Sequence, residues 1–146
     1  MNSYKRLVEN FWAPIMASYG VENRTAAIRI IAPPTCPASA TRLEVRVCGA
    51  DVNPYLAISA ILASGYYGIV NKLELPFEAL ENGGCGDRLA RNLAEATVRM
   101  KEPKSIARAV LGNDFVDHFV ATREHEWRLW ENSVTDWEVK RYMEPI

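Results

Sequence analysis

Two short segments near the start of the chain alternate apolar and polar residues with a period of two. They cover residues 24–31 and 41–47, and β-branched or long apolar side chains are frequent in both. Successive side chains of a strand point to opposite faces, so this period is typical of half-buried strands. The stretch between them is rich in proline and small residues, which is typical of a loop. We therefore predict two strands joined by a loop.

The second predicted strand has two chemically different faces. Arg42, Glu44 and Arg46 share one face. Leu43, Val45 and Val47 share the other face. We expect the apolar face to be packed against the rest of the fold. The charged face would then present a carboxylate flanked by two guanidinium groups.

A stretch without charged residues follows the predicted strands. Residues 55–70 carry no charge, and Asn53 and Pro54 precede them. Asparagine is a good N-cap, and proline fits the first helical position because its missing N–H would have no partner there. A helix that is apolar on most sides is generally buried, so we expect this one to be buried. A membrane span needs about 20 predominantly apolar residues, and glycine, serine and tyrosine dilute this shorter run, so we expect no membrane partner.

The rest of the chain has the pattern of amphipathic helices. After a loop with a Gly-Gly tip at residues 83–84, apolar residues recur with helical spacing. Gly112 suits a helix C-cap, and Thr135 with Glu138 has the spacing of a capping box. We expect the four tryptophans and the aromatic residues of these helices to form core.

Together these segments predict an α+β fold. Residues 1–50 would form a short antiparallel β segment with loops, and residues 51–146 would form the helical part. The length of 146 residues corresponds to one domain or to part of a larger protein. Two strands alone are marginally stable in water, so they normally need more strands or a packed cover.

The overall charge excludes some classes of function. The chain has 17 basic and 18 acidic residues and a net charge of −1, which gives no support to nucleic-acid binding. Its three cysteines form no CxxC pair, which favours a reducing compartment over a disulfide framework or a cysteine zinc site. The first residues lack the apolar stretch of a secretory signal. We therefore expect a cytoplasmic protein.

The charges are unevenly distributed along the chain. Residues 1–46 carry six basic and three acidic side chains, and five of the six basic ones are arginine. The planar fork of arginine suits carboxylates and phosphates. A cross-strand ladder of ion pairs would be the plain interpretation. One glutamate cannot neutralise five arginines, which favours a bound anion or a metal–phosphate group. The candidate residues are Arg6, Arg24, Arg29, Arg42, Glu44 and Arg46.

Four segments of the chain resemble, in order and approximate spacing, the C-terminal part of the glutamine synthetase catalytic domain. They are residues 2–7, 23–29, 41–46 and 53–69. The helical tail from residue 111 resembles the carboxy-terminal helices of glutamine-synthetase-like ligases. The resemblance implies an ATP-dependent ligase that forms a γ-glutamyl amide from glutamate and ammonia or an organic amine, through γ-glutamyl phosphate. Because members of that family assemble as rings, it also implies a homo-oligomer.

The resemblance further implies roles for the residues around the phosphoryl group. Arg24 and Arg29 would be catalytic residues that hold the transferring phosphoryl group, and both would bind the nucleotide. Arg42 would contact the nucleotide phosphates. Glu44 would be a ligand of the Mg²⁺ or Mn²⁺ bound to ATP.

On the substrate side, the resemblance includes one departure from the family. Arg6 would bind the carboxylate of glutamate, and Arg46 would contact glutamate and the developing tetrahedral adduct. The family usually carries a glutamate just before the turn equivalent to Ala13–Pro14, where it closes the site and helps to deprotonate ammonium. Here Trp12 stands there instead. We therefore expect Trp12 to bind the substrate and to favour a larger, less polar amine.

A second departure concerns what precedes the matched region in the family. Most of its metal-ligating residues and the ammonium-side aspartate lie upstream of that region. We therefore expect the isolated chain to be inactive. The alternative from a different class is a non-catalytic, stand-alone binding or interaction module derived from the same fold.

Overall fold

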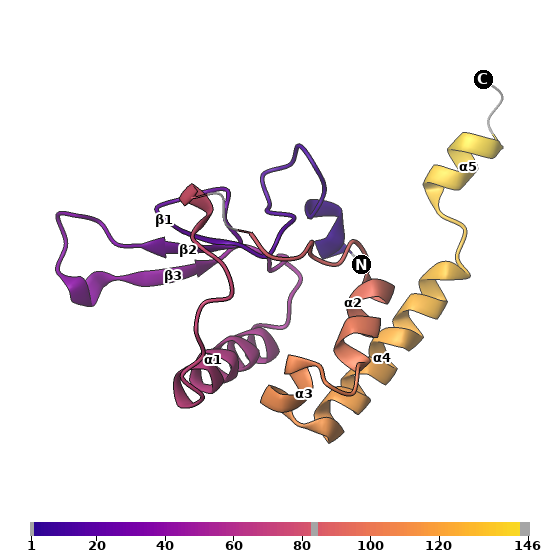
Figure 1. Cartoon of the computed structure of the whole chain (residues 1–146). Coiled ribbons are helices and arrows are strands. Elements are labelled where there is room, and N and C mark those ends of the chain that lie inside the picture. The colour runs from indigo at the N-terminus through magenta and orange to yellow at the C-terminus, as the bar shows by residue number, and fades with distance from the viewer. Residues whose placement is uncertain (1, 83–84, 144–146) are drawn as a thin grey trace. The chain divides into compact units, whose positions relative to one another are not determined.

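The computed structural model describes residues 2–82 and 85–143. The chain divides into two compact units, residues 1–95 and 96–146. The first contains the 3-10 turns η1 (Asn2–Arg6), η2 (Ala38–Ala40) and η3 (Leu80–Asn82), the strands β1 (Tyr19–Val21), β2 (Ile28–Ile31) and β3 (Arg42–Val45), and the helix α1 (Pro54–Val70) (Figure 1). The helix α2 (Leu93–Lys101) crosses the boundary, and the second unit continues with α3 (Ile106–Leu111), α4 (Asn113–Glu131) and α5 (Asp136–Tyr142).

The strands form one mixed sheet in the order β1-β2-β3. β2 and β3 are antiparallel, as predicted, whereas β1 pairs with β2 in parallel and was not predicted. A strand of three residues is too short to show a period. The α+β class is confirmed. The first predicted strand begins later than expected, at Ile28, because the Asn23 side chain accepts hydrogen bonds from both the amide and the hydroxyl of Thr25 and so closes a turn.

The expectation that the apolar face of β3 is packed is wrong at Leu43, whereas Val45 and Val47 on the same face are half-buried. Leu43 is 65% exposed, and Ile28 on the neighbouring strand is also exposed. The buried residues of this unit lie instead beside the sheet and include Ala26, Ala27 and Ser18.

The helix α1 begins as predicted but is not buried. Asn53 accepts hydrogen bonds from the amides of Tyr55 and Leu56, and Pro54 occupies the first turn. No residue of α1 is buried, and Tyr55 is 82% exposed. The burial prediction is therefore wrong here, because composition sets what a helix can bury but not whether a neighbour covers it. Among the described residues, no helix is long and apolar enough to cross a membrane.

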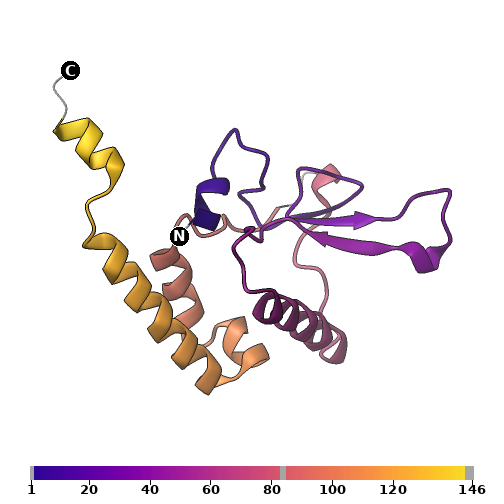
Figure 2. The same cartoon turned by 180° about the vertical axis from the view of Figure 1, so that it is seen from behind.

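In the second unit, α3 and α4 lie side by side in both views (Figures 1 and 2). Val116 and Val120 of α4 are buried, and Lys101 forms an ion pair with Glu124 at 2.9 Å. Gly112 ends α3 with a φ of +83°, a conformation that glycine adopts without strain, which confirms the predicted C-cap.

Of two further local expectations, the capping box is confirmed and the Gly-Gly tip cannot be compared with the structure. The capping box at the start of α5 is present, because Thr135 and Glu138 exchange side-chain and backbone hydrogen bonds. The Gly-Gly tip at residues 83–84 lies outside the described residues.

The aromatic residues contradict the expectation that they form core. Trp12, Trp130 and Trp137 are exposed, and Trp127 is half-buried against the Trp130 ring at a centroid distance of 4.8 Å. The aromatic surface is therefore open in this chain.

Candidate functional site

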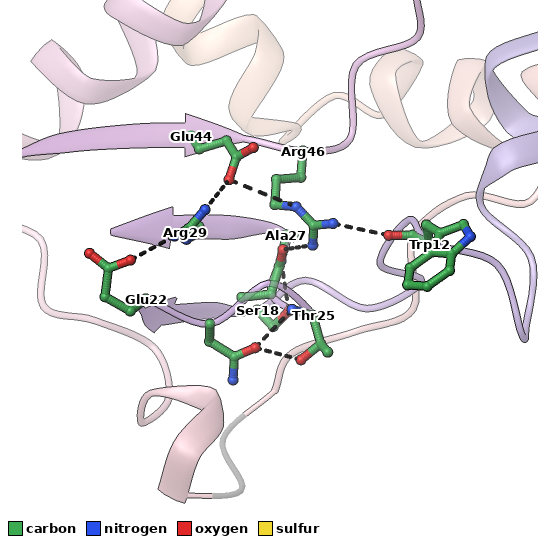
Figure 3. A network of polar contacts seen from close by, with 10 residues as sticks. Trp12, Ser18, Glu22, Thr25, Ala27, Arg29, Glu44 and Arg46 are labelled. Atoms are coloured by element: carbon green, nitrogen blue, oxygen red, sulfur yellow. Dashed lines mark hydrogen bonds and ion pairs between the residues drawn. The ribbon is translucent and has the colours of Figure 1, made fainter. Parts of the chain in front are cut away.

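The charged face of β2 and β3 brings together three of the residues predicted from the sequence. The antiparallel register places Arg29 directly opposite Glu44, and Arg46 follows the end of β3. Figure 3 shows the Arg29 guanidinium between the carboxylates of Glu22 and Glu44, and Arg46 between Glu44 and the backbone of Trp12. The arginines and the glutamate that lie within one network are thus Arg29, Arg46 and Glu44.

Arg29 is only partly satisfied by its neighbours. Its Nη2 donates to Glu22 Oε2 at 2.6 Å, and its Nη1 reaches Glu44 Oε2 at 3.5 Å. Its Nε is buried and has no hydrogen-bond partner among the described residues, although the side chain as a whole is 18% exposed. The hydrogen bond to Glu22 raises the pKa of Arg29 above its ordinary value, so the guanidinium stays charged.

Arg46 is anchored by main-chain carbonyl groups. Its Nη1 donates to the carbonyl of Ala26 at 3.1 Å, and its Nη2 donates to the carbonyl of Trp12 at 3.0 Å. Its Nε lies 4.0 Å from Glu44 Oε2. The two carbonyl groups are neutral, so they orient the guanidinium of Arg46 without placing a further negative charge beside it.

The buried residue Ser18 fixes the backbone that leads into β2. Its hydroxyl oxygen accepts a hydrogen bond from the amide of Ala27 at 3.1 Å, and its carbonyl accepts one from the amide of Ile28 at 3.0 Å. The amide of Arg46 in turn donates to the carbonyl of Ala27 at 2.9 Å. This buried segment therefore joins the start of β2 to the end of β3 and sets the distance between their charged side chains.

The other predicted arginines lie outside this network. Arg24 is exposed in the turn before β2, and it forms no hydrogen bond or ion pair with another described residue. Arg42 at the start of β3 donates only to the carbonyl of Ala40, at 3.4 Å. Arg6 in η1 donates to the carbonyl of Cys48. Among the described residues, these three arginines therefore form no hydrogen bond or ion pair with Glu44.

Trp12 contributes to the network only through its backbone. Its indole is 96% exposed, whereas its carbonyl oxygen accepts the hydrogen bond from Arg46. The ring is therefore free to meet a ligand, and the main chain at this position is tied to one of the predicted substrate-binding residues.

The donor set fits a nucleotide with its divalent cation. Glu44 is 45% exposed and offers the hard oxygen that Mg²⁺ and Mn²⁺ prefer. The guanidinium groups of Arg29 and Arg46 flank it, and arginine pairs well with phosphate oxygens. Among the described residues, no group of three or more His, Cys, Asp or Glu side chains is placed to hold a metal ion, so Glu44 would supply one ligand of several.

Sequence reasoning missed Glu22. Its carboxylate binds Arg29, and that hydrogen bond is the largest cause of the lowered pKa of Glu22. The signal was present, since Glu22 is one of only three acidic residues in an arginine-rich segment. A pairing across seven residues through a turn could not be read from the pattern.

Comparison with known proteins shows which family the chain is similar to. The sequence profile for the glutamine synthetase catalytic domain matches residues 1–142. Type-1 glutamine synthetase 2 of Dictyostelium discoideum is 47% identical over all of this chain and 28% of its own length. Glutamate–isopropylamine ligase of a Pseudomonas species is 39% identical over all of the chain and 32% of its own length. Glutamine synthetase of Thermotoga maritima is 40% identical over 98% of the chain and 34% of its own length.

These similarities place the chain in a family of glutamate ligases. The chain belongs to the glutamine synthetase family and matches the catalytic domain of that family. It spans about a third of the length of the curated relatives it matches.

Proposed function

We propose that this chain provides part of the ATP- and glutamate-binding site of a glutamate–amine ligase. In the proposed reaction, ATP phosphorylates the γ-carboxylate of glutamate, and an amine then displaces phosphate from the γ-glutamyl phosphate to form an amide. The observation that carries the proposal is the network in which Arg29 and Arg46 flank the exposed carboxylate of Glu44.

The phosphoryl group would be held by the arginines of β2 and its preceding turn. A transferring phosphoryl group spreads negative charge over its oxygens, and fixed positive groups stabilise that charge. Arg29 and Arg24 would hold this group, and Arg42 would contact the nucleotide phosphates. Glu44 would be one oxygen ligand of the Mg²⁺ or Mn²⁺ that ATP brings.

Glutamate would be bound from the other side of the network. Arg6 would bind its carboxylate, and Arg46 would contact both glutamate and the tetrahedral adduct formed when the amine attacks. The two backbone carbonyls that hold Arg46 support this role, because they fix the direction of its guanidinium before the substrate arrives.

The amine would meet Trp12. An aromatic ring attracts an alkylammonium ion by about 0.5–2 kcal/mol and adds apolar contact for its carbon chain. Ammonium is small and strongly hydrated, so it gains less. A relative named gamma-glutamylethanolamide synthetase, from Streptomyces coelicolor, is 35% identical over 99% of this chain and 30% of its own length. The names of this relative and of the Pseudomonas isopropylamine ligase support an organic amine as the proposed substrate.

A chimeric enzyme tests the proposal. This chain would replace the matching third of Thermotoga maritima glutamine synthetase, and phosphate release would be measured with ATP, glutamate and an amine. We expect activity, and we expect Arg46→Ala to lower kcat/KM on the order of a hundredfold. The matched control is Arg91→Ala, whose arginine pairs with Glu95 away from the network. A folded, inactive chimera would favour the alternative, a non-catalytic binding or interaction module.

The same chimera tests the choice of amine. A panel of ammonia, methylamine, ethanolamine and longer alkylamines would be compared with and without Trp12→Glu. We expect organic amines to be preferred and the substitution to shift the kcat/KM ratio toward ammonia. A preference for ammonia over every organic amine, or an unchanged ratio, would reduce Trp12 to a packing residue.

We also propose that the chain self-associates and acts in the cytoplasm, without nucleic-acid or membrane partners. The exposed apolar side chains of α1 support self-association, since such a surface favours contact with another chain. Sedimentation velocity over a range of concentrations checks this expectation. A sharp monomer at every concentration would contradict it.

A further inference from the structure

Glu22 lies at the end of β1 in a conformation that its residue type rarely adopts. Its φ is +53°, in the left-handed region that is uncommon for residues other than glycine, asparagine and aspartate. Its amide donates to the carbonyl of Ile30 at 2.8 Å, which continues the pairing with β2. Such a conformation persists where surrounding contacts fix it and is found in many functional sites.

The carboxylate of Glu22 holds β2 at two points. Oε2 accepts the 2.6 Å hydrogen bond from Arg29 Nη2, and Oε1 accepts a 2.9 Å hydrogen bond from the amide of Ala32 just beyond the strand. One oxygen thus binds the side chain of Arg29 in β2, and the other binds the backbone of the residue that follows β2. Both carboxylate oxygens of Glu22 are therefore engaged, one with Arg29 and one with Ala32.

This double contact fixes the direction of the Arg29 guanidinium. Because Nη2 is held by Glu22, Nη1 faces Glu44 at 3.5 Å, a distance that leaves this donor weakly engaged. The Arg29 side chain forms no other hydrogen bond or ion pair among the described residues, and its Nε has no partner there. Without Glu22, the guanidinium would lose its only short contact and could rotate away from Glu44.

We infer that Glu22 is a positioning residue that aims Nη1 of Arg29 at the anion-binding side of the network. The inference rests on the proposed function, because it takes that anion to be a phosphate group. Glu22 acts through Arg29 and does not itself touch the ligand.

A simple countercharge would behave differently from a positioning residue. If Glu22 acted only through its charge, Glu22→Gln would make the site more positive and tighten anion binding. A positioning residue predicts the opposite, because a neutral amide holds the guanidinium less firmly. Glu22→Asp distinguishes the countercharge role from the positioning role further. It keeps the negative charge, but its side chain is one methylene too short to bind both Arg29 and the amide of Ala32.

The test uses the 146-residue chain, inorganic pyrophosphate as the probe and NMR of the arginine side chains. We expect pyrophosphate to shift the Arg29 and Arg46 signals. We expect both Glu22→Gln and Glu22→Asp to weaken this binding about three- to tenfold and to free the rotation of the Arg29 Nη groups. The matched control is Glu9→Gln, which removes the carboxylate paired with Arg88 and should change neither readout. Glu22→Asn, a residue type that tolerates the left-handed backbone, carries the test if Glu22→Gln does not fold.

The outcomes separate this inference from the proposed function. Tighter or unchanged binding in Glu22→Gln would overturn the positioning role. If the wild-type chain binds no pyrophosphate, the proposed function loses its support. The positioning role of Glu22 is then decided only by the NMR measurement of the rotation of the Arg29 Nη groups. Hindered rotation in the wild type and free rotation in Glu22→Gln would then support it, and equal rotation would overturn it.

Discussion

Two arginines, one in each compact unit, are buried to a similar degree but are held very differently. The Arg108 side chain is 14% exposed and that of Arg29 is 18% exposed. Every nitrogen of Arg108 has an acceptor. Nε donates to the carbonyls of Lys101 and Glu102 at 3.2 Å, Nη1 to Asn113 at 3.2 Å, and Nη2 to the Lys101 carbonyl at 3.0 Å and to Asp117 at 2.7 Å. Arg29 has one short contact, one long contact and an Nε without a partner.

The difference separates a structural arginine from one that is available to a ligand. The partners of Arg108 belong to the end of α2, the segment after it and the start of α4, so this guanidinium joins the helices of unit 2. Each of its three nitrogens donates to at least one of these partners. Arg29 is directed by Glu22 but retains donors, which is what a phosphate-binding residue requires.

The largest effect on stability should come from Arg108→Ala. The substitution removes a set of hydrogen bonds and leaves the carbonyls of Lys101 and Glu102 without that donor, so we expect a loss of about 2–3 kcal/mol in the free energy of unfolding. Urea unfolding followed by far-UV circular dichroism measures it. Arg108→Lys should recover little, because lysine lacks the planar fork. Full recovery by lysine would mean that the charge alone matters.

Arg29→Ala should separate stability from binding. We expect a smaller shift of the urea midpoint than for Arg108→Ala, because Arg29 makes only one short hydrogen bond. We also expect pyrophosphate affinity, measured by calorimetry, to fall about tenfold or more. If Arg29→Ala destabilised the chain as much as Arg108→Ala does, the contrast between the two arginines would be broken.

The pH dependence of stability should expose the pair of Glu22 and Arg29. The hydrogen bond from Arg29 holds the pKa of Glu22 below its ordinary value of 4.5. A carboxyl group whose pKa is lowered by folding stabilises the fold above its unfolded pKa, and this stabilisation is lost as the pH falls through the folded pKa. We expect wild type and Glu22→Gln to differ in urea midpoint at pH 7, and we expect this difference to shrink as the pH falls below 4.5 and through the folded pKa of Glu22. A difference that stays constant as the pH falls below 4.5 would contradict this prediction.

We expect the smallest effect in the phosphate release of the isolated chain, which Arg29→Ala should leave unchanged. The purified chain, given ATP, Mg²⁺, glutamate and an amine, should release no more phosphate than its Arg29→Ala variant. Glu44 would supply one oxygen ligand under the proposed function, and a divalent site needs several. No group of three or more His, Cys, Asp or Glu side chains is placed for such a site among the described residues. Phosphate release above that control would show that the chain carries a complete catalytic site.

The sequence by itself determined the features whose hydrogen bonds close within about four residues. The Asn53–Pro54 start of α1, the glycine after α3 and the capping box of α5 are all present as predicted, because a helix end needs only its own neighbours. The four ordered motifs of the sequence also indicated the family. The period of two along residues 41–47 further predicted that Glu44 lies beside arginine on one face of a strand.

Only the tertiary structure decided burial and partners. Leu43 and α1 are exposed despite their apolar composition, because burial depends on whether another element lies over them. Glu22 reaches Arg29 across a turn, and Arg46 reaches the Trp12 carbonyl across 34 residues. Such contacts depend on the path of the backbone between the two ends, and no local period encodes that path. For this reason the sequence identified the arginines, whereas the fold determined which of them keeps a donor for a ligand.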